Sequence, residues 1–210
     1  PDIRLYFVRT PDGFNGSGSE TYDFDSLAKL WAGTVPDVTT VDDAATYTAD
    51  QLTDLLSGLM NLHQPDHIHL QDHTSEHSDM EHSDHLHAAE FTTAALAGYD
   101  ADYTVTSYVG YATWGFEENV SGAQHDATRE TFLEYAAHDP QVYESDGTLI
   151  DSYDEWLQRE YVANEYVDTA SPADPAAFFE QLMVADGTDS FDVTADPPPD
   201  EVLVDEFLIL

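Results

Sequence analysis

Residues 65–87, PDHIHLQDHTSEHSDMEHSDHLH, determine how the rest of this chain is interpreted. Eight of the ten histidines lie between His63 and His87, with acidic residues interspersed among them. The stretch begins with an extended apolar run at residues 67–70 and leads into a sequence that favours a helix from Ser83 onward. A loop between a strand and a helix lies at the carboxyl end of a sheet, where open α/β folds bind ligands. The stretch therefore predicts a strand, a functional loop and a helix.

The histidines of this stretch indicate metal binding. Neutral imidazole is the commonest metal ligand, and carboxylates orient such ligands through hydrogen bonds. A short unit, Glu-His-Ser-Asp, occurs at residues 76–79 and again at 81–84. His73, His77 and His82 could form a separate local zinc or copper site. A solvated acidic loop without metal is the alternative that composition leaves open.

The composition restricts the environment and the partners of the chain. Its 210 residues include 43 acidic and 5 basic ones, giving a net charge of −38. Because the acid is spread along the chain, it predicts a solvated surface and a salt-loving source. The scarcity of Lys and Arg argues against nucleic acid and against an anionic membrane surface as partners. Since there is no cysteine, disulfides, thiolate metal sites and cysteine nucleophiles are excluded.

The alternation of apolar runs predicts an α/β fold with a mainly parallel, Rossmann-like sheet flanked by helices. Four segments rich in β-formers are expected to be strands: residues 3–9, 38–41, 67–70 and 103–109. Four segments are expected to be helices: residues 25–31, 49–62, 83–99 and 128–137. Asp25 and Thr48 are the expected caps of the first two helices.

The carboxyl-terminal part of the chain has a different character. We expect one domain at residues 1–165 and a linker-rich extension at 166–210. The extension ends with EVLVDEFLIL, residues 201–210, a strand-like apolar segment. Because an unpaired apolar strand favours aggregation, we expect it to add to the sheet, join a further domain or meet a partner, including a second copy. The expected location is extracellular or at the cell surface, with the cytoplasm of a salt-accumulating cell as the alternative.

The order of motifs resembles the PIG-L (LmbE-like) family of de-N-acetylases. The matching motifs run from R-x-PDG with its Gly-rich loop through SLAKLW, a Tyr-Thr-x-x-Gln-Leu helix, QPDHIHLQD, HSDH and TSYVGY to Asn-Val-Ser and EYAAHD. They cover residues 1–142. The resemblance implies a Rossmann-like fold and a zinc-dependent hydrolase, although another divalent metal could replace zinc. Its expected substrates are N-acetylglucosamine-type sugar conjugates, from which it removes N-acetyl or similar N-acyl groups.

The resemblance also implies roles for the HSDH motif. Its last histidine, His85, is a zinc ligand in the family's pattern. His82 faces the reacting carbonyl, where it stabilises the oxyanion or shuttles a proton, and Asp84 maintains the charge and tautomer of these groups. Bound zinc would polarise the amide carbonyl and lower the pKa of water to about 7.

An aromatic loop follows the predicted strand at residues 103–109. Tyr108, Tyr111 and Trp114 in this loop could form a sugar-stacking rim, or they could pack against the sheet.

One departure from the family pattern concerns the first strand. The family's His-Pro-Asp-Asp motif, which supplies two zinc ligands and the general base, does not occur in these 210 residues. The predicted strand at residues 3–9 corresponds to the family's second strand, so the first strand-helix unit is missing. We expect the chain to be part of a longer protein. The alternatives are that another segment fills the gap, or that the chain is a non-catalytic metal-binding or structural surface protein.

Overall fold

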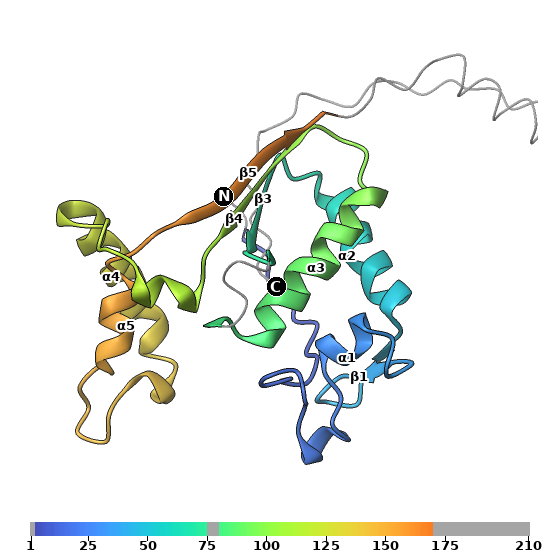
Figure 1. Cartoon of the computed structure of the whole chain (residues 1–210), viewed down its shortest axis with the longest axis horizontal. Helices are drawn as coiled ribbons and strands as arrows, with labels where there is room; N and C mark the ends of the chain where they lie inside the picture. Colours follow the sequence, from blue (N-terminus) through green and yellow to red (C-terminus); the bar gives the residue numbers. More distant parts are fainter. Residues whose placement is uncertain (1–2, 75–79, 170–210) are drawn as a thin grey trace, which may run out of the picture.

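The structure, a computed structural model, describes residues 3–74 and 80–169, and a three-stranded sheet lies at its centre (Figure 1). The strands, in their order across the sheet, are β3 (His67–Gln71), β4 (Tyr103–Tyr108) and β5 (Val162–Asp168). β3 and β4 are parallel, whereas β4 and β5 are antiparallel. The prediction of an α/β fold is confirmed, and the fold is compatible with a Rossmann-like arrangement. The sheet is mixed, so its parallel character is confirmed only for β3 and β4.

Helix α2, Ala49–His63, forms as the sequence predicts. Thr48 caps it, because its hydroxyl accepts from the Gln51 N–H at 3.2 Å while the Gln51 side chain accepts from the Thr48 N–H at 3.0 Å. This reciprocal pair provides acceptors for two N–H groups that have no hydrogen-bond partner within the helix. One face of the helix is buried and includes Leu52, Leu56, Leu59 and Met60. That face fixes α2 against the core, so the periodic leucines serve packing.

Helix α3, Ser83–Ala95, lies between the two parallel strands β3 and β4 in the sequence. It begins directly after His82, and a 3₁₀ turn, Leu96–Gly98, continues it to the end predicted from sequence. α3 contacts α1, α2 and β3. Its buried Phe91 and Ala95 join the hydrophobic core with Ile68 of β3. The strand and the helix predicted from residues 65–87 are therefore confirmed. Residues 75–79 of the loop between them lie outside the described residues.

The elements before α2 are short. Helix α1, Leu27–Trp31, is capped by Ser26, whose buried hydroxyl accepts from the Lys29 N–H at 3.2 Å. The prediction of Asp25 as the cap is thus wrong by one residue. β1 (Val38–Thr39) and β2 (Thr46–Tyr47) form a separate antiparallel hairpin, so the strand predicted at residues 38–41 is present but shorter.

The predicted strand at residues 3–9 is wrong. This segment joins no sheet in the described part of the chain, and Arg9 at its end has a left-handed backbone with a φ of 61°. Its apolar side chains alternate: Ile3, Leu5 and Phe7 are exposed, whereas Val8 packs against the core. The β-forming residues favour an extended backbone, but a strand also requires a neighbour that provides hydrogen bonds.

The part of the chain after β4 differs most from the predictions. α4, Gly122–Ala136, begins six residues before the predicted start at residue 128. The prediction missed its first turns because they are polar and show no apolar residues at helical spacing. α5, Asp151–Trp156, and β5 were not predicted. All residues of β5 are exposed, so hydrophobic alternation could not identify it. β5 spans the predicted domain boundary at residue 165, and the expected strand at residues 201–210 lies outside the described residues.

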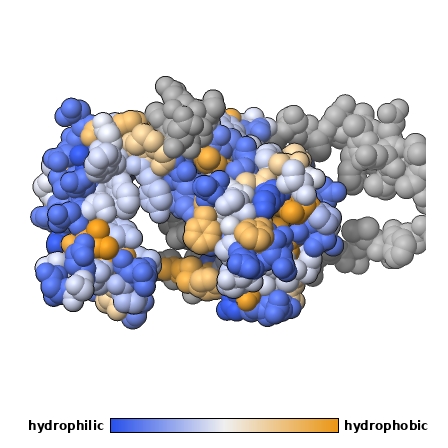
Figure 2. Space-filling view, turned by 60° about the horizontal axis from the view of Figure 1, so that its bottom comes forward, coloured by the Kyte–Doolittle hydropathy of each residue, from blue (hydrophilic) through white to orange (hydrophobic). Residues whose placement is uncertain are grey.

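Hydrophilic residues predominate on the face of the molecule shown in Figure 2. Arginine side chains neutralise little of the acid, in exposed pairs such as Arg9 with Asp42 at 2.6 Å and Arg129 with Asp154 at 2.9 Å. Within the described residues, no helix combines the length and apolar character that crossing a membrane requires.

Candidate metal centre

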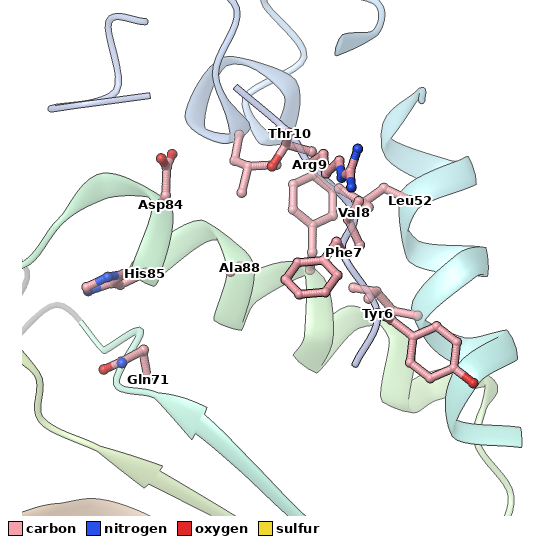
Figure 3. Close-up of a pocket in the computed structure, with 13 residues that line it drawn as sticks. Tyr6, Phe7, Val8, Arg9, Thr10, Leu52, Gln71, Asp84, His85 and Ala88 are labelled. Carbon is pink, nitrogen blue, oxygen red and sulfur yellow. The ribbon is translucent and has the colours of Figure 1, made fainter. Parts of the chain in front are cut away.

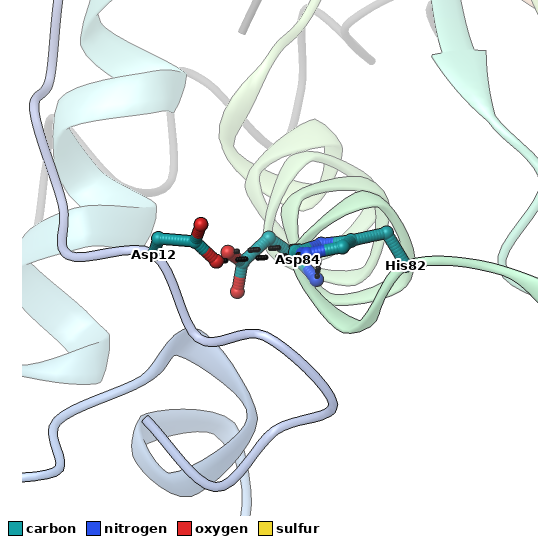
Figure 4. A group of neighbouring side chains, drawn as sticks. All are labelled: Asp12, His82 and Asp84. Carbon is teal, nitrogen blue, oxygen red and sulfur yellow. Dashed lines mark hydrogen bonds and ion pairs between the residues drawn. The ribbon is translucent and has the colours of Figure 1, made fainter. Parts of the chain in front are cut away.

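Three side chains from two distant parts of the chain meet at the start of α3 (Figure 4). Asp12 comes from the loop that follows residues 3–9, and His82 and Asp84 flank the first residue of the helix. One potential ligand atom from each lies within 4.8 Å of the others. His82 Nε2 is 3.5 Å from Asp12 Oδ1, and His82 Nδ1 is 3.8 Å from Asp84 Oδ2. This His/Asp/Asp group could hold a metal ion.

The environment of the Asp84 carboxylate favours the binding of a cation. Its Oδ2 accepts from the Gly13 N–H at 2.8 Å, but its Oδ1 is buried and has no hydrogen-bond partner among the described residues. Burial, and to a smaller extent the neighbouring Asp12, raise the pKa of Asp84. A bound cation would oppose both effects and provide Oδ1 with a partner. The residues present therefore fit a divalent metal.

Gly13 allows the Asp12 loop to approach the start of α3, so a larger residue at this position tests the geometry of the site. A Cβ at Gly13 would lie 2.5 Å from Asp84 Oδ1 and 2.9 Å from the Ser26 Cβ, so Gly13→Ala must displace the carboxylate or the loop. We expect zinc affinity, measured by calorimetric titration, to fall by roughly 10–100-fold, as when a group that positions a ligand is changed. Gly58→Ala is the matched control, because a Cβ there meets nothing within 4 Å. Equal zinc affinities in the two variants would contradict this geometry.

His82 caps α3, and this contact determines which ring nitrogen carries its proton. The Asp84 N–H donates to His82 Nδ1 at 3.2 Å. Because Nδ1 accepts, the neutral ring carries its proton on Nε2, which faces Asp12. His82 is therefore arranged as a hydrogen-bond donor at the site.

His85 has the opposite arrangement, because a buried carboxylate orients its ring. Its Nδ1 lies 2.6 Å from Glu81 Oε1. Glu81 also accepts from the N–H groups of His82 at 3.0 Å and Tyr111 at 2.8 Å. Burial alone would raise the pKa of Glu81, but the hydrogen bonds from His85, His82 and Tyr111 outweigh it and lower the pKa. Ionised Glu81 thus holds the proton of His85 on Nδ1 and leaves the Nε2 lone pair available.

Sequence reasoning missed both Asp12 and Glu81. Asp12 lies in the PDG motif, but nothing local indicates that it meets the helix start. Glu81 is the first residue of the second Glu-His-Ser-Asp unit and lies four positions before His85. That spacing places two side chains next to each other on a helical turn and could have revealed the pair.

A cavity of about 390 Å³ adjoins the site (Figure 3). Asp84 and His85 lie at one end of it, near Gln71 at the carboxyl end of β3. The rest of the wall is mainly apolar and comes from residues 6–10 and from helices α1, α2 and α3. The location agrees with the prediction of a site at the carboxyl end of the sheet.

The three residues predicted as a sugar rim separate in the structure. Tyr111 lies beside the site, with its ring centre 5.1 Å from that of His85, and it stacks on Trp156 at 4.9 Å. Trp114 is exposed and donates to Glu155 at 2.7 Å. The Tyr108 hydroxyl lies 3.2 Å from His69 Nδ1. Tyr111 is therefore the residue of the three that the structure places next to His85.

The second metal site considered from sequence involves His73, His77 and His82. His77 lies outside the described residues. Across residues 3–74 and 80–169, Asp12, His82 and Asp84 form the one group of three or more ligand side chains close enough to share an ion.

No family model, curated protein or solved structure matches this chain. Since α/β folds support many unrelated activities, the fold alone does not indicate a function, whereas the chemistry of this site and the order of the sequence motifs do.

Proposed function

We propose that the chain is a zinc-dependent hydrolase that removes N-acetyl or similar N-acyl groups from N-acetylglucosamine-type sugar conjugates. The observation that carries the proposal is the convergence of Asp12 with His82 and Asp84, beside a histidine whose ring is fixed by buried Glu81. The ordered motifs that resemble the PIG-L family support the reaction class and the substrate.

The donor set suits zinc, which binds imidazole nitrogen and carboxylate oxygen. Catalytic zinc sites commonly use three protein ligands and keep one open position. Bound zinc would polarise the acyl carbonyl and lower the pKa of water. The carboxylates of Asp12 and Asp84, together with an imidazole, would hold the ion.

The hydrogen bonds support different tasks for the two histidines. His85 presents a free Nε2 lone pair because Glu81 holds its other proton, so we assign it as the imidazole ligand. His82 presents Nε2–H and is suited to donate to the oxygen that gains negative charge during attack on the amide. The positive end of α3 lies at the same point and favours that charge.

Distances alone suggest a different assignment, because they group His82 with the two aspartates. The ring centres of the two histidines are only 5.4 Å apart. For His82 to bind metal through Nε2, the proton must move to Nδ1, and the contact that caps the helix would be lost. The hydrogen bonds favour His85 as the ligand, because they determine which ring nitrogen has a free lone pair, whereas small rotations of the side chains change the distances.

The proposed function is tested by acetate release from N-acetylglucosamine conjugates. We expect the protein to release acetate in molar salt, to lose this activity on treatment with a chelator, and to regain it with zinc. Release that survives complete removal of metal would contradict the metal-dependent reaction. Tight zinc binding without acetate or other acyl release from a panel of N-acyl sugars would favour the alternative, a non-catalytic metal-binding protein.

A further inference from the structure

The cavity beside the metal centre changes in character along its length (Figure 3). Asp84 and His85 lie at one end, with the Gln71 side chain nearby. Beyond them α3 contributes Ala88 and Phe91, which follow Asp84 by four and seven residues and therefore lie on the same face of the helix. From the rise of an α-helix, this face runs about 10 Å away from Asp84. The cavity thus begins at the candidate metal centre and continues along an apolar face of α3.

The walls away from the metal centre offer few hydrogen bonds to a ligand. The Tyr6 hydroxyl lies 2.7 Å from His63 Nε2, and the Arg9 guanidinium donates to Asp42 at 2.6 Å, so both polar groups already have partners. Thr10 contributes one further hydroxyl. A sugar ring would lose water from several hydroxyls in this part of the cavity and find few replacements. The walls therefore favour an apolar group over a sugar.

The apolar lining suits a hydrocarbon chain. Leu52, Leu56 and Phe91 line the cavity as buried core residues, whereas Phe7 lines it and is 72% exposed. An apolar ligand would cover the Phe7 ring, and such removal of apolar surface from water stabilises a complex. The volume of about 390 Å³ is typical of a small-molecule site. The methyl group of an acetyl is about as large as a water molecule, which takes up about 30 Å³, so acetyl would leave most of the cavity unfilled.

We propose that this cavity binds the acyl chain of the substrate, and that the chain is a medium-length hydrocarbon such as octanoyl instead of acetyl. This inference rests on the proposed function, because it takes the amide carbonyl to lie at the metal centre. From the end formed by Asp84 and His85, the chain would extend along α3 past Ala88. The sugar would remain outside, next to the exposed Tyr111 ring that contacts His85.

The reaction at such a substrate is amide hydrolysis. The oxygen of water forms a bond to the acyl carbon, the C–N bond breaks, and the two protons of the water pass to the nitrogen. The products are a medium-chain carboxylate, which retains the chain that the cavity holds, and a sugar that carries an ammonium group. The carboxylate product is therefore a probe for the acyl site that the protein cannot hydrolyse.

Binding of product carboxylates tests the acyl site without hydrolysis. We expect calorimetric titration of the full chain, with zinc and in molar salt, to show octanoate binding at least about 100-fold more tightly than acetate, because each fully buried methylene strengthens binding about fourfold. The affinity of hexanoate should lie between the two. Equal affinities for acetate, hexanoate and octanoate would overturn the inference.

Ala88→Leu tests whether the chain lies in this cavity. The larger side chain would occupy the path of the chain along α3, so we expect the ratio of octanoate to acetate affinity to fall at least about tenfold. Ala94→Leu is the matched control, because Ala94 is a partly buried alanine of the same helix that lines a different hollow. It should leave the ratio unchanged. An unchanged ratio in Ala88→Leu, with thermal unfolding that shows a folded protein, would overturn the inference. If Ala88→Leu does not fold, the carboxylate series with the unaltered protein decides.

Hydrolysis separates this inference from the proposed function. We expect kcat/KM for octanoate release from N-octanoylglucosamine to exceed that for acetate release from N-acetylglucosamine by at least about tenfold. Binding that increases with chain length, without release of any acyl group, would support the acyl-chain site and contradict the hydrolase. Acetate release combined with equal binding of all three carboxylates would support the hydrolase and overturn the acyl-chain site.

Discussion

His85→Ala is expected to lose zinc binding and amide hydrolysis together. The reason is that Glu81 holds the His85 proton on Nδ1, which directs a free lone pair to the site from a ring that packs against Tyr111. Without this ring, the two carboxylates would have to hold zinc without the imidazole that we assign to the ion. Zinc binding is measured by calorimetric titration, and hydrolysis by acetate release from N-acetylglucosamine conjugates.

His82→Ala provides the contrasting result. This variant should retain zinc but lower the hydrolysis rate by roughly 10²–10³, the usual effect of removing one donor to a developing oxyanion. Because His82 also caps α3, thermal unfolding must be measured in parallel, and His82→Asn, which keeps a capping group, should retain more stability than His82→Ala. His77→Ala, in the first copy of the repeat, is the matched control and should change neither property.

The comparison of the two histidine variants separates three outcomes. If His82→Ala abolishes zinc binding and His85→Ala spares it, the ion is bound by the group that the distances select, and the roles of the two histidines are exchanged. If both variants bind zinc and release acetate as the unaltered protein does, the proposed centre is wrong. Loss of hydrolysis without loss of zinc in both variants would place the histidines in the chemistry alone.

The parts of the fold that the sequence predicted correctly depend on local patterns. α2 has apolar residues at helical spacing and a capping pair at residues 48 and 51, so its first turn and buried face follow from adjacent residues. β3 and α3 similarly combine a β-forming run with a helix start at Ser83. These elements contain their own signals, and the core then forms from their apolar faces.

The errors concern features that depend on distant residues. Residues 3–9 have the composition of a strand, but a strand forms only where another strand pairs with it. No described strand pairs with residues 3–9. β5 shows the reverse, because its exposed residues lack a hydrophobic pattern and its position is fixed by backbone pairing with β4. A local pattern can predict extended backbone, but it cannot supply the partner.

The same distinction applies to the site. His82, Asp84 and His85 were selected from one short motif, and the structure places all three around the first turn of α3. Asp12 could not be selected in this way, because the contact between its loop and the helix joins residues 71 positions apart, Gly13 and Asp84. Zinc itself, the sugar substrate and the roles of the histidines remain predictions that the proposed experiments test.

Folding is expected to depend strongly on salt. With a net charge of −38, the chain repels itself at low ionic strength, where the Debye length is roughly 30 Å at 0.01 M. At 1 M salt the Debye length is about 3 Å, so repulsion between surface carboxylates is largely screened. We expect thermal unfolding, followed by circular dichroism, to shift to markedly higher temperature as potassium chloride rises from millimolar to molar concentration, with little folded protein at the lowest salt.

A charge variant distinguishes screening from a general effect of concentrated solute. Asp50 and Asp54 lie four residues apart on the exposed face of α2, a spacing at which like charges destabilise a helix by about 0.2–0.5 kcal/mol. Asp54→Asn should therefore stabilise the protein at low salt and lose this advantage at molar salt, where the repulsion is screened. Leu62→Gln, an exposed change on the same helix without a change of charge, is expected to show no such salt-dependent gain. Equal unfolding temperatures at low and molar salt would contradict the dominance of surface repulsion, and an Asp54→Asn benefit that persists at molar salt would assign the gain to helix propensity.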